Sequence, residues 1–182
     1  MKRQTGFTLT ELMVVLAIVA ILLSIGVPSY RYITNSYRMS AEVNGLLGDL
    51  QYARSEAIRQ GQTVTTCVST NGTACTGGFA WAGGWIVFSD PNANSTVDAG
   101  ETVLRVQSAF TGRIPDTFTA SNGVTAITYN REGFASTTPA GFFTTITLKD
   151  STANAGWTRC LVIAAATPLS TQTHTMNPAA CP

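Results

Sequence analysis

The chain has 182 residues, of which only 12% are charged, and its formal net charge is +1 at pH 7. This length suits one membrane segment and one globular domain with a core of its own. The near balance of charge argues against a protein that attracts nucleic acid or an acidic partner through its overall charge. The single histidine, His174, lies in a polar tail, and no phosphate loop or nucleophile constellation accompanies it. We therefore expect no enzymatic activity.

The first residues combine a short basic start with a long apolar run. Most of Met1 to Gly6 is polar or basic, whereas Phe7 to Val27 are 21 almost wholly apolar residues. As an α-helix this run rises about 1.5 Å per residue and covers roughly 30 Å, the thickness of a bilayer core. A secretory signal peptide is the competing interpretation, but its apolar core is shorter. The sequence therefore predicts a membrane-spanning helix over residues 7–28.

Glu11 is the one acidic residue inside this apolar run. A carboxylate in a membrane helix costs on the order of 3 kcal/mol or more unless a partner compensates it. A plain membrane anchor leaves that cost unexplained. If the chain is cut between Gly6 and Phe7, however, the new amino group of Phe7 in one subunit can neutralise Glu11 of its neighbour. The anchor would then also be an assembly element.

Residues Lys2 to Gly6 followed by Phe7 to Leu12 resemble the class III leader and cleavage site of type IV pilins. The resemblance implies that a prepilin peptidase removes residues 1–6 by cutting after Gly6 and methylates the amino group of Phe7. It also implies that Glu11 acts in assembly with other pilins. Thr10 is a mild departure, because many members have isoleucine there. The implied location is the bacterial inner membrane, crossed once, with the C-terminal domain in the periplasm before incorporation into a pilus or pseudopilus.

The helical pattern continues beyond the apolar run, over residues 29–61. Gly26 and Pro28 predict a kink or a locally melted turn, because proline removes one helical hydrogen bond. Gly61 is a suitable C-cap, so we expect one helix from about Phe7 to Gln60. An apolar stripe at steps of three and four residues predicts the face that packs on a sheet: Val43, Leu46, Leu47, Leu50, Ala53, Ala57 and Ile58.

Residues 62–182 are rich in Gly, Ser, Thr and Asn and predict a β-rich globular domain. Turn residues bound each strand candidate, and several candidates alternate with period two. The candidates are Thr63–Ser69, Gly84–Ser89, Thr102–Gln107, Ala126–Tyr129, Phe142–Leu148 and Cys160–Ala165. The fold class we expect is α+β, a long N-terminal helix packed on antiparallel sheets.

Four segments resemble the GspH/FimT family of minor pilins and type II secretion pseudopilins: Gln51–Ala57, the cysteine pair Cys67 and Cys75, Gly84–Asp90 and Val103–Val106. The resemblance implies a pilin-like fold whose β-rich domain is displayed near the filament tip and helps to prime assembly. Pilus and type II secretion pseudopilus share these features, so both remain open, with the pilus favoured.

The four cysteines form two locally spaced couples, Cys67 with Cys75 and Cys160 with Cys181. An even number in an exported chain favours disulfides, although four cysteines allow three connectivities. We favour the two local pairs. Zinc is not favoured, because the ligand spacing and histidine support of a zinc site are missing.

The segment from Asp90 to Glu101 has the oxygen spacing of a calcium loop. Oxygen-bearing side chains stand at loop positions 1, 3, 5, 9 and 12, namely Asp90, Asn92, Asn94, Asp98 and Glu101. Ser95 replaces the glycine of the sharp turn, and Pro91 restricts the start. We therefore favour an ordinary polar hairpin loop over calcium binding.

The resemblance to FimT-like proteins also implies a second alternative, a DNA-binding minor pilin in natural transformation. Some such proteins take part in DNA uptake and carry a basic Gly-Arg-containing motif near the C-terminus, but this chain departs from that pattern. No arginine follows Arg159, and the basic residues of the domain are scattered: Arg105, Arg113, Arg131, Lys149 and Arg159. Phosphate binding relies on clustered cations. DNA is therefore a possible partner that the sequence does not favour. We expect the tryptophans, Trp81, Trp85 and Trp157, to fill the core.

Overall fold

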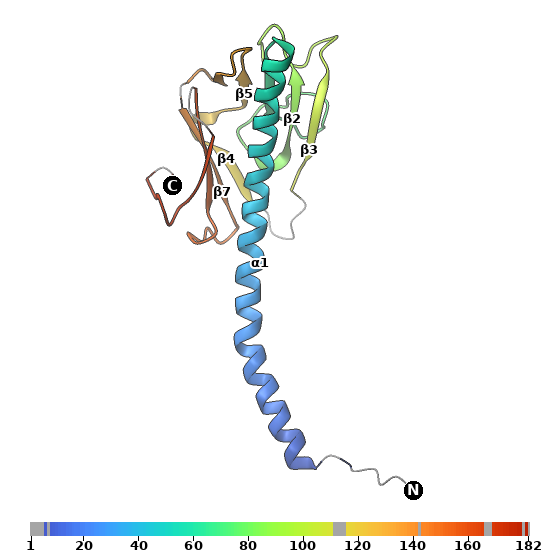
Figure 1. Ribbon diagram of the computed structural model, residues 1–182, viewed down its shortest axis with the longest axis vertical. Helices are drawn as coiled ribbons and strands as arrows, with labels where there is room; N and C mark the ends of the chain where they lie inside the picture. Colours follow the sequence, from blue (N-terminus) through green and yellow to red (C-terminus); the bar gives the residue numbers. More distant parts are fainter. Residues whose placement is uncertain are drawn as a thin grey trace. The chain divides into compact units, whose positions relative to one another are not determined.

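The computed structural model describes Gly6 and residues 8–110, 116–141, 143–165, 169–179 and 181. The chain divides into two compact units, Met1–Tyr37 and Arg38–Pro182. One helix, α1 (Leu9–Gln60), supplies residues to both units, and the second unit also contains every strand (Figure 1). The α+β class predicted from the sequence is confirmed.

Helix α1 is continuous, as predicted, and remains helical through Pro28. Of the two outcomes expected there, the locally melted turn was wrong; the blue N-terminal half of α1 curves in Figure 1 without breaking. Proline leaves the carbonyl of Ser24 without its helical donor. One turn earlier, the Ser24 hydroxyl donates to the carbonyl of Ile21 at 2.7 Å. The helix thus loses one hydrogen bond at Pro28 but remains continuous.

The second half of α1 presents a buried stripe to the domain core. Its apolar members follow steps of four and three residues: Met39, Val43, Leu46, Leu50, Ala53 and Ala57. Leu47 is partly buried beside this stripe, but the prediction for Ile58 was wrong, because its side chain is 53% exposed. Ile58 stands about 100° around the helix from Ala57 and so leaves the buried face.

Gly61 ends α1 in the left-handed region, at φ +66°, as a C-cap requires. The amide of Gln62 donates to the carbonyl of Ala57 at 3.3 Å, which satisfies one of the carbonyls at the helix end.

Nine strands form two antiparallel sheets within the described part of the chain. The five-stranded sheet has the order β3-β2-β1-β5-β6, and the four-stranded sheet has the order β4-β7-β8-β9. Their bounds are β1 Val64–Val68, β2 Gly84–Ser89, β3 Val103–Ser108, β4 Thr117–Ala120, β5 Ala126–Tyr129, β6 Ala135–Thr138, β7 Phe143–Lys149, β8 Arg159–Ala164 and β9 Ser170–Thr173. Two short 3₁₀ segments, Trp81–Gly83 and Ser121–Gly123, precede β2 and β5.

All six predicted strands are present, with ends within one or two residues. Strands β4, β6 and β9 were missed. Each has only four residues, and threonine, serine and alanine predominate in them. Such a segment has too few apolar residues to show an alternating pattern.

The main core lies between the second half of α1 and both sheets. The stripe on α1 packs with residues of the five-stranded sheet, such as Val87 and Ile127, and of the four-stranded sheet, such as Leu148 and Leu161. A smaller cluster includes Ile86 and Phe88, which alternate along β2 with the core residues Trp85 and Val87. The predicted core position of the tryptophans is confirmed, because Trp81 and Trp85 are buried and Trp157 packs against the core.

Candidate functional site

The start of α1 is fixed by a threonine cap. The Thr8 hydroxyl accepts from the amide of Glu11 at 3.2 Å, and the Thr8 carbonyl accepts from Leu12 at 3.1 Å. Threonine followed three residues later by glutamate is the capping-box pattern, in which the side chain satisfies an orphan amide of the first turn. This role of Thr8 was not predicted, although threonine at position 8 and glutamate at position 11 are visible in the sequence.

Glu11 is therefore held in the first turn of α1, where the helix dipole favours a negative charge. Its side chain is exposed, and no ion pair to it occurs among the described residues. Gly6 is exposed and has no neighbour within 4 Å of an added Cβ. Phe7 lies outside the described residues. The carboxylate is thus available to a group from another molecule.

The apolar run behind Glu11 is exposed along its whole length. None of its most apolar window is buried, and by length and composition α1 can cross a membrane. Exposed fractions of the large side chains range from 42% at Val19 to 75% at Leu9. This surface needs an apolar surrounding, which a bilayer or neighbouring helices can provide.

Asp49 fastens the second half of α1 to the five-stranded sheet. Its two carboxylate oxygens accept from Trp85 Nε1 and from an Arg105 terminal nitrogen, each at 2.9 Å. The guanidinium of Arg105 also lies 3.9 Å from the ring centroid of Tyr52, a cation–π contact. These contacts join α1 to neighbouring strands β2 and β3.

A second charged group lies near the start of the globular unit. Arg38 pairs with Glu42 one turn later and with Asp116, whose side chain is only 1% exposed. Burial raises the pKa of Glu42, and one of its carboxylate oxygens, Oε2, is buried without a hydrogen-bond partner in the described part of the structure. The sequence could not indicate the Arg38–Asp116 pair, because 78 positions separate its members.

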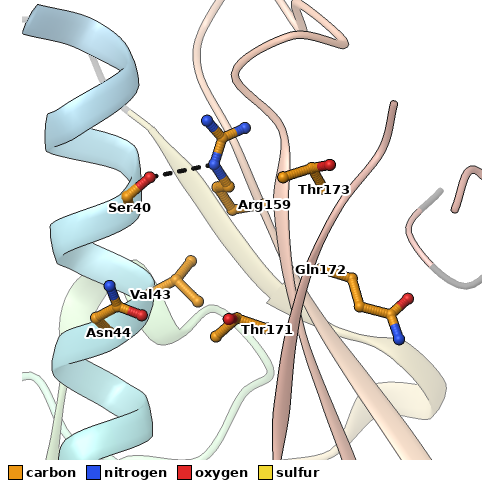
Figure 2. A pocket seen from close by; sticks show the side chains of 7 residues that line it. All are labelled: Ser40, Val43, Asn44, Arg159, Thr171, Gln172 and Thr173. Carbon is orange, nitrogen blue, oxygen red and sulfur yellow. Dashed lines mark hydrogen bonds between the residues drawn. The ribbon is translucent and has the colours of Figure 1, made fainter. Parts of the chain in front are cut away.

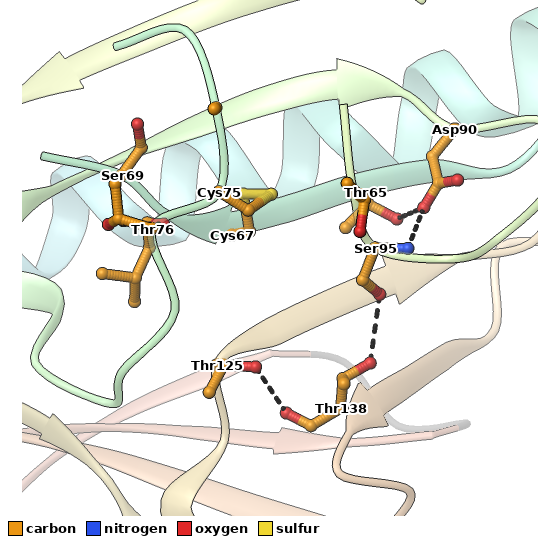
Figure 3. Close-up of a disulfide and its surroundings, with 12 residues drawn as sticks. Thr65, Cys67, Ser69, Cys75, Thr76, Asp90, Ser95, Thr125 and Thr138 are labelled. Carbon is orange, nitrogen blue, oxygen red and sulfur yellow. Dashed lines mark hydrogen bonds between the residues drawn. A yellow bond between two sulfur atoms is a disulfide. The ribbon is translucent and has the colours of Figure 1, made fainter. Parts of the chain in front are cut away.

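Both local disulfides are present, Cys67–Cys75 and Cys160–Cys181, and their Cα atoms are 5.6 Å and 5.5 Å apart. The first joins β1 to the loop that follows it, and Figure 3 shows it near the Asp90 loop. The second ties the C-terminal tail to β8. The predicted pairing is thereby confirmed.

Asp90, the first residue of the calcium-like loop, is fully buried and organises the loop from within (Figure 3). Its carboxylate accepts from the Thr65 hydroxyl at 2.7 Å and from the amides of Asn94 and Ser95 at 3.1 and 3.0 Å. Ser95 adopts φ +59°, the conformation that glycine usually supplies in such a turn. This carboxylate already has three donors.

The other candidate ligands also bond to one another. Asp98 accepts from the side-chain amides of Asn92 and Asn94, and these bonds lower its pKa. Glu101 accepts from the amide of Asp98 at 2.9 Å. Among the described residues no three histidine, cysteine, aspartate or glutamate side chains gather as a metal-binding group. The ordinary polar loop stays the prediction, with calcium binding as its less favoured alternative.

The basic residues proposed as alternatives for DNA binding stand on different elements. Arg105 on β3 pairs with Asp49, and Arg131 between β5 and β6 pairs with Glu132. Arg159 on β8 donates to Ser40 and to two backbone carbonyls. Arg113 lies outside the described residues. DNA binding stays the unfavoured alternative, and these pairings give it no support.

A cavity of about 150 Å³ lies between α1 and the strands β8 and β9 (Figure 2). Ser40, Val43 and Asn44 line it from the helix, and Arg159 bridges to Ser40 at 3.2 Å. Its other residues come from β9: Thr171, Gln172 and Thr173. The lining is mostly uncharged and polar.

Known protein families match both the N-terminal segment and the globular unit of the chain. The profile described as the prokaryotic N-terminal methylation motif matches residues 1–27, and the profile described as type II transport protein GspH matches residues 42–167. The pilin-like protein PilA1 of Thermus thermophilus is 35% identical over 96 residues, which are 53% of this chain and 54% of that protein. A fimbrial protein of Pseudomonas aeruginosa is 35% identical over 79 residues, 43% of this chain and 51% of its own length.

The chain thus spans about half the length of the curated relatives it matches. Among solved structures, the type IV minor pilin FimU of Pseudomonas aeruginosa superposes with a TM-score of 0.59 at 19% identity, over 82% of this chain and 99% of FimU. At 19% identity, this structural similarity establishes only that the two proteins share a fold.

An exposed apolar helix with an acidic first turn, followed by a helix half that packs on antiparallel sheets, defines a type IV pilin-like protein. Within that class, the chain belongs to the GspH/FimT family, whose profile matches more than half of its length. Such proteins are structural and not enzymes. The family and the apolar helix together indicate membrane anchoring and incorporation into a pilus-like filament.

Proposed function

We propose that this chain is a minor subunit of a type IV pilus, cut between Gly6 and Phe7 by a prepilin peptidase and methylated on Phe7. Before assembly, α1 anchors it in the bacterial inner membrane with the globular unit in the periplasm. In the filament it primes assembly or lies near the tip. The observation that carries this proposal is the exposed apolar run of α1 with one carboxylate, Glu11, in its first turn.

Glu11 has the central role in this account. Its carboxylate neutralises the amino group of Phe7 in a neighbouring subunit, so that two charges that are costly in an apolar bundle compensate each other. The Thr8 cap supports the arrangement, since it fixes the turn that carries Glu11. Helix packing along the apolar run is the main contact with other pilins.

The test is incorporation into filaments by a Glu11→Ala variant, with Glu11→Asp as the matched control. We expect Glu11→Ala to be cleaved and to stay in the membrane but to fall at least tenfold in sheared filaments, whereas Glu11→Asp keeps part of the wild-type level. A tenfold loss corresponds to about 1.4 kcal/mol. Normal incorporation of Glu11→Ala would contradict the neutralisation mechanism.

A second candidate is a pseudopilin of a type II secretion system, which the description of the matching family profile supports. The two candidates differ in their deletion phenotype. Loss of twitching or of surface pili supports the pilus, and retention of exported proteins in the periplasm supports secretion.

A further inference from the structure

Aromatic and cationic side chains follow the apolar run of α1 just after Pro28 and Ser29. Tyr30 and Tyr32 are 72% and 51% exposed, and Arg31 between them is exposed as well. The preceding apolar run contains few polar groups, and the hydroxyl of Ser24 is bonded to the backbone at 2.7 Å. The surface of the helix therefore changes from apolar to amphipathic within one turn.

The distance of Tyr30 from the middle of the apolar run indicates its depth in the membrane. If Ala17, the midpoint of residues 7–27, lies at the bilayer centre, then Tyr30 stands thirteen residues away, or about 20 Å at 1.5 Å per residue. The hydrocarbon core ends about 15 Å from the centre and the headgroup layer about 20–22 Å from it. Tyr30 and Arg31 thus fall within the headgroup layer, and Tyr32, about 22 Å from the centre, lies at its outer edge. Tyr37, about 30 Å from the centre, lies in water.

The residue types fit that layer. Tyrosine is enriched at membrane interfaces because its ring is apolar and its hydroxyl is polar, and an arginine guanidinium binds phosphate through paired donors. We propose that Tyr30, Arg31 and Tyr32 form a lipid-headgroup collar, in which Arg31 binds the phosphodiester of a phospholipid and the tyrosines fix the depth of α1. The collar rests on the membrane anchoring in the proposed function.

A helix of another subunit is the competing occupant of this surface. Three consecutive residues cover about 200° of the helix circumference, at about 100° per residue. A single neighbouring helix contacts a narrower stripe, made at steps of three and four residues. Lipid headgroups, which surround the helix on all sides, can contact all three residues, whereas one neighbouring helix cannot.

Depth-dependent fluorescence quenching tests the collar on the uncleaved full chain in vesicles of phosphatidylethanolamine and phosphatidylglycerol. Tryptophan replaces one residue at a time, in Leu16→Trp, Tyr30→Trp and Tyr37→Trp, and lipids carry bromine either near the headgroup or near the chain end. Signal from Trp81, Trp85 and Trp157 is subtracted by measuring the parent chain in parallel.

We expect Tyr30→Trp to be quenched at least twofold more by shallow than by deep bromines, Leu16→Trp to show the reverse, and Tyr37→Trp to be quenched by neither. No quenching of Tyr30→Trp, with Leu16→Trp still quenched by deep bromines, would overturn the collar and favour a protein partner there, while leaving the anchor intact. If Leu16→Trp also escapes quenching, the membrane anchoring itself is wrong.

The phosphate contact is tested by Arg31→Glu and Arg31→Lys in the Tyr30→Trp background. The acidic variant repels lipid phosphate and should shift the depth of the tryptophan at position 30, so the ratio of shallow to deep quenching should fall to half of its value or less. Lysine keeps the positive charge and should keep the ratio. An unchanged ratio in Arg31→Glu would remove Arg31 from the collar.

Discussion

At the scale of single residues, Glu56 is an acidic side chain buried on the core-facing side of α1. Hydrogen bonds from Arg59 and then Gln60 lower the pKa of Glu56 to about 2, because they favour its charged form. A glutamate in the unfolded chain has a pKa of about 4.3. The folded protein therefore gains stability from ionised Glu56 above that value, and the gain disappears as the pH falls toward 2.

The corresponding prediction is a pH-dependent effect of Glu56→Gln. We expect the variant to be less stable than the parent at pH 6, and the difference to shrink between about pH 4.3 and pH 2. Urea unfolding of the full chain in detergent, followed at several pH values, measures it. A difference that stays constant over this range would show that Glu56 does not titrate as described.

Asp49 offers a second test at this scale, because one carboxylate serves both Trp85 and Arg105. Asp49→Ala should destabilise the domain by about 1–3 kcal/mol, since Trp85 Nε1 is left without its acceptor. Arg105→Ala should cost less, about 0.2–1 kcal/mol, because the arginine side chain is 47% exposed. A double-mutant cycle in urea measures the coupling, and equal costs for both variants would contradict the shared role of Asp49.

At the scale of elements, the two disulfides close loops of different length. Cysteine separations of 8 and 21 residues give loop entropies worth about 2.5 and about 3.3 kcal/mol. Replacing Cys160 and Cys181 by serine should therefore lower the free energy of unfolding more than replacing Cys67 and Cys75. Urea unfolding of both double variants tests the order, and the reverse order would mean that local contacts outweigh loop length.

The elements also show what a sequence can and cannot reveal. The apolar run, the stripe on α1 and the Gly61 cap are local patterns, and the helix follows them closely. Short strands such as β6 owe their place to pairing with a neighbour, here β5, and no local pattern marks them.

The residues of the candidate site likewise fall into those that local sequence patterns predict and those that only the folded structure reveals. Glu11 and both cysteine pairs could be read from motif and spacing, and the Thr8 cap could have been. Arg38 with Asp116, and Asp49 with Arg105, bring together residues far apart in the chain. Such pairs depend on tertiary packing, so only the folded structure shows them.

At the scale of the whole molecule, the first and second parts of α1 have different functions. Its first part provides the apolar surface for membrane and filament, and its second part is the central element of the domain core. Buried contacts and charged pairs fix that second part to both sheets. The apolar surface of the first part is left for partners outside the chain.

The central claim is that the chain is a processed pilin, and intact mass with N-terminal sequencing of the membrane-extracted protein tests it most directly. The protein is expressed with and without a prepilin peptidase. We expect a peptidase-dependent start at Phe7, one added methyl group and the loss of four cysteine hydrogens. A start at Met1 in both samples would contradict the account and leave an ordinary membrane anchor, and a start well beyond Val27 would show a secretory signal instead.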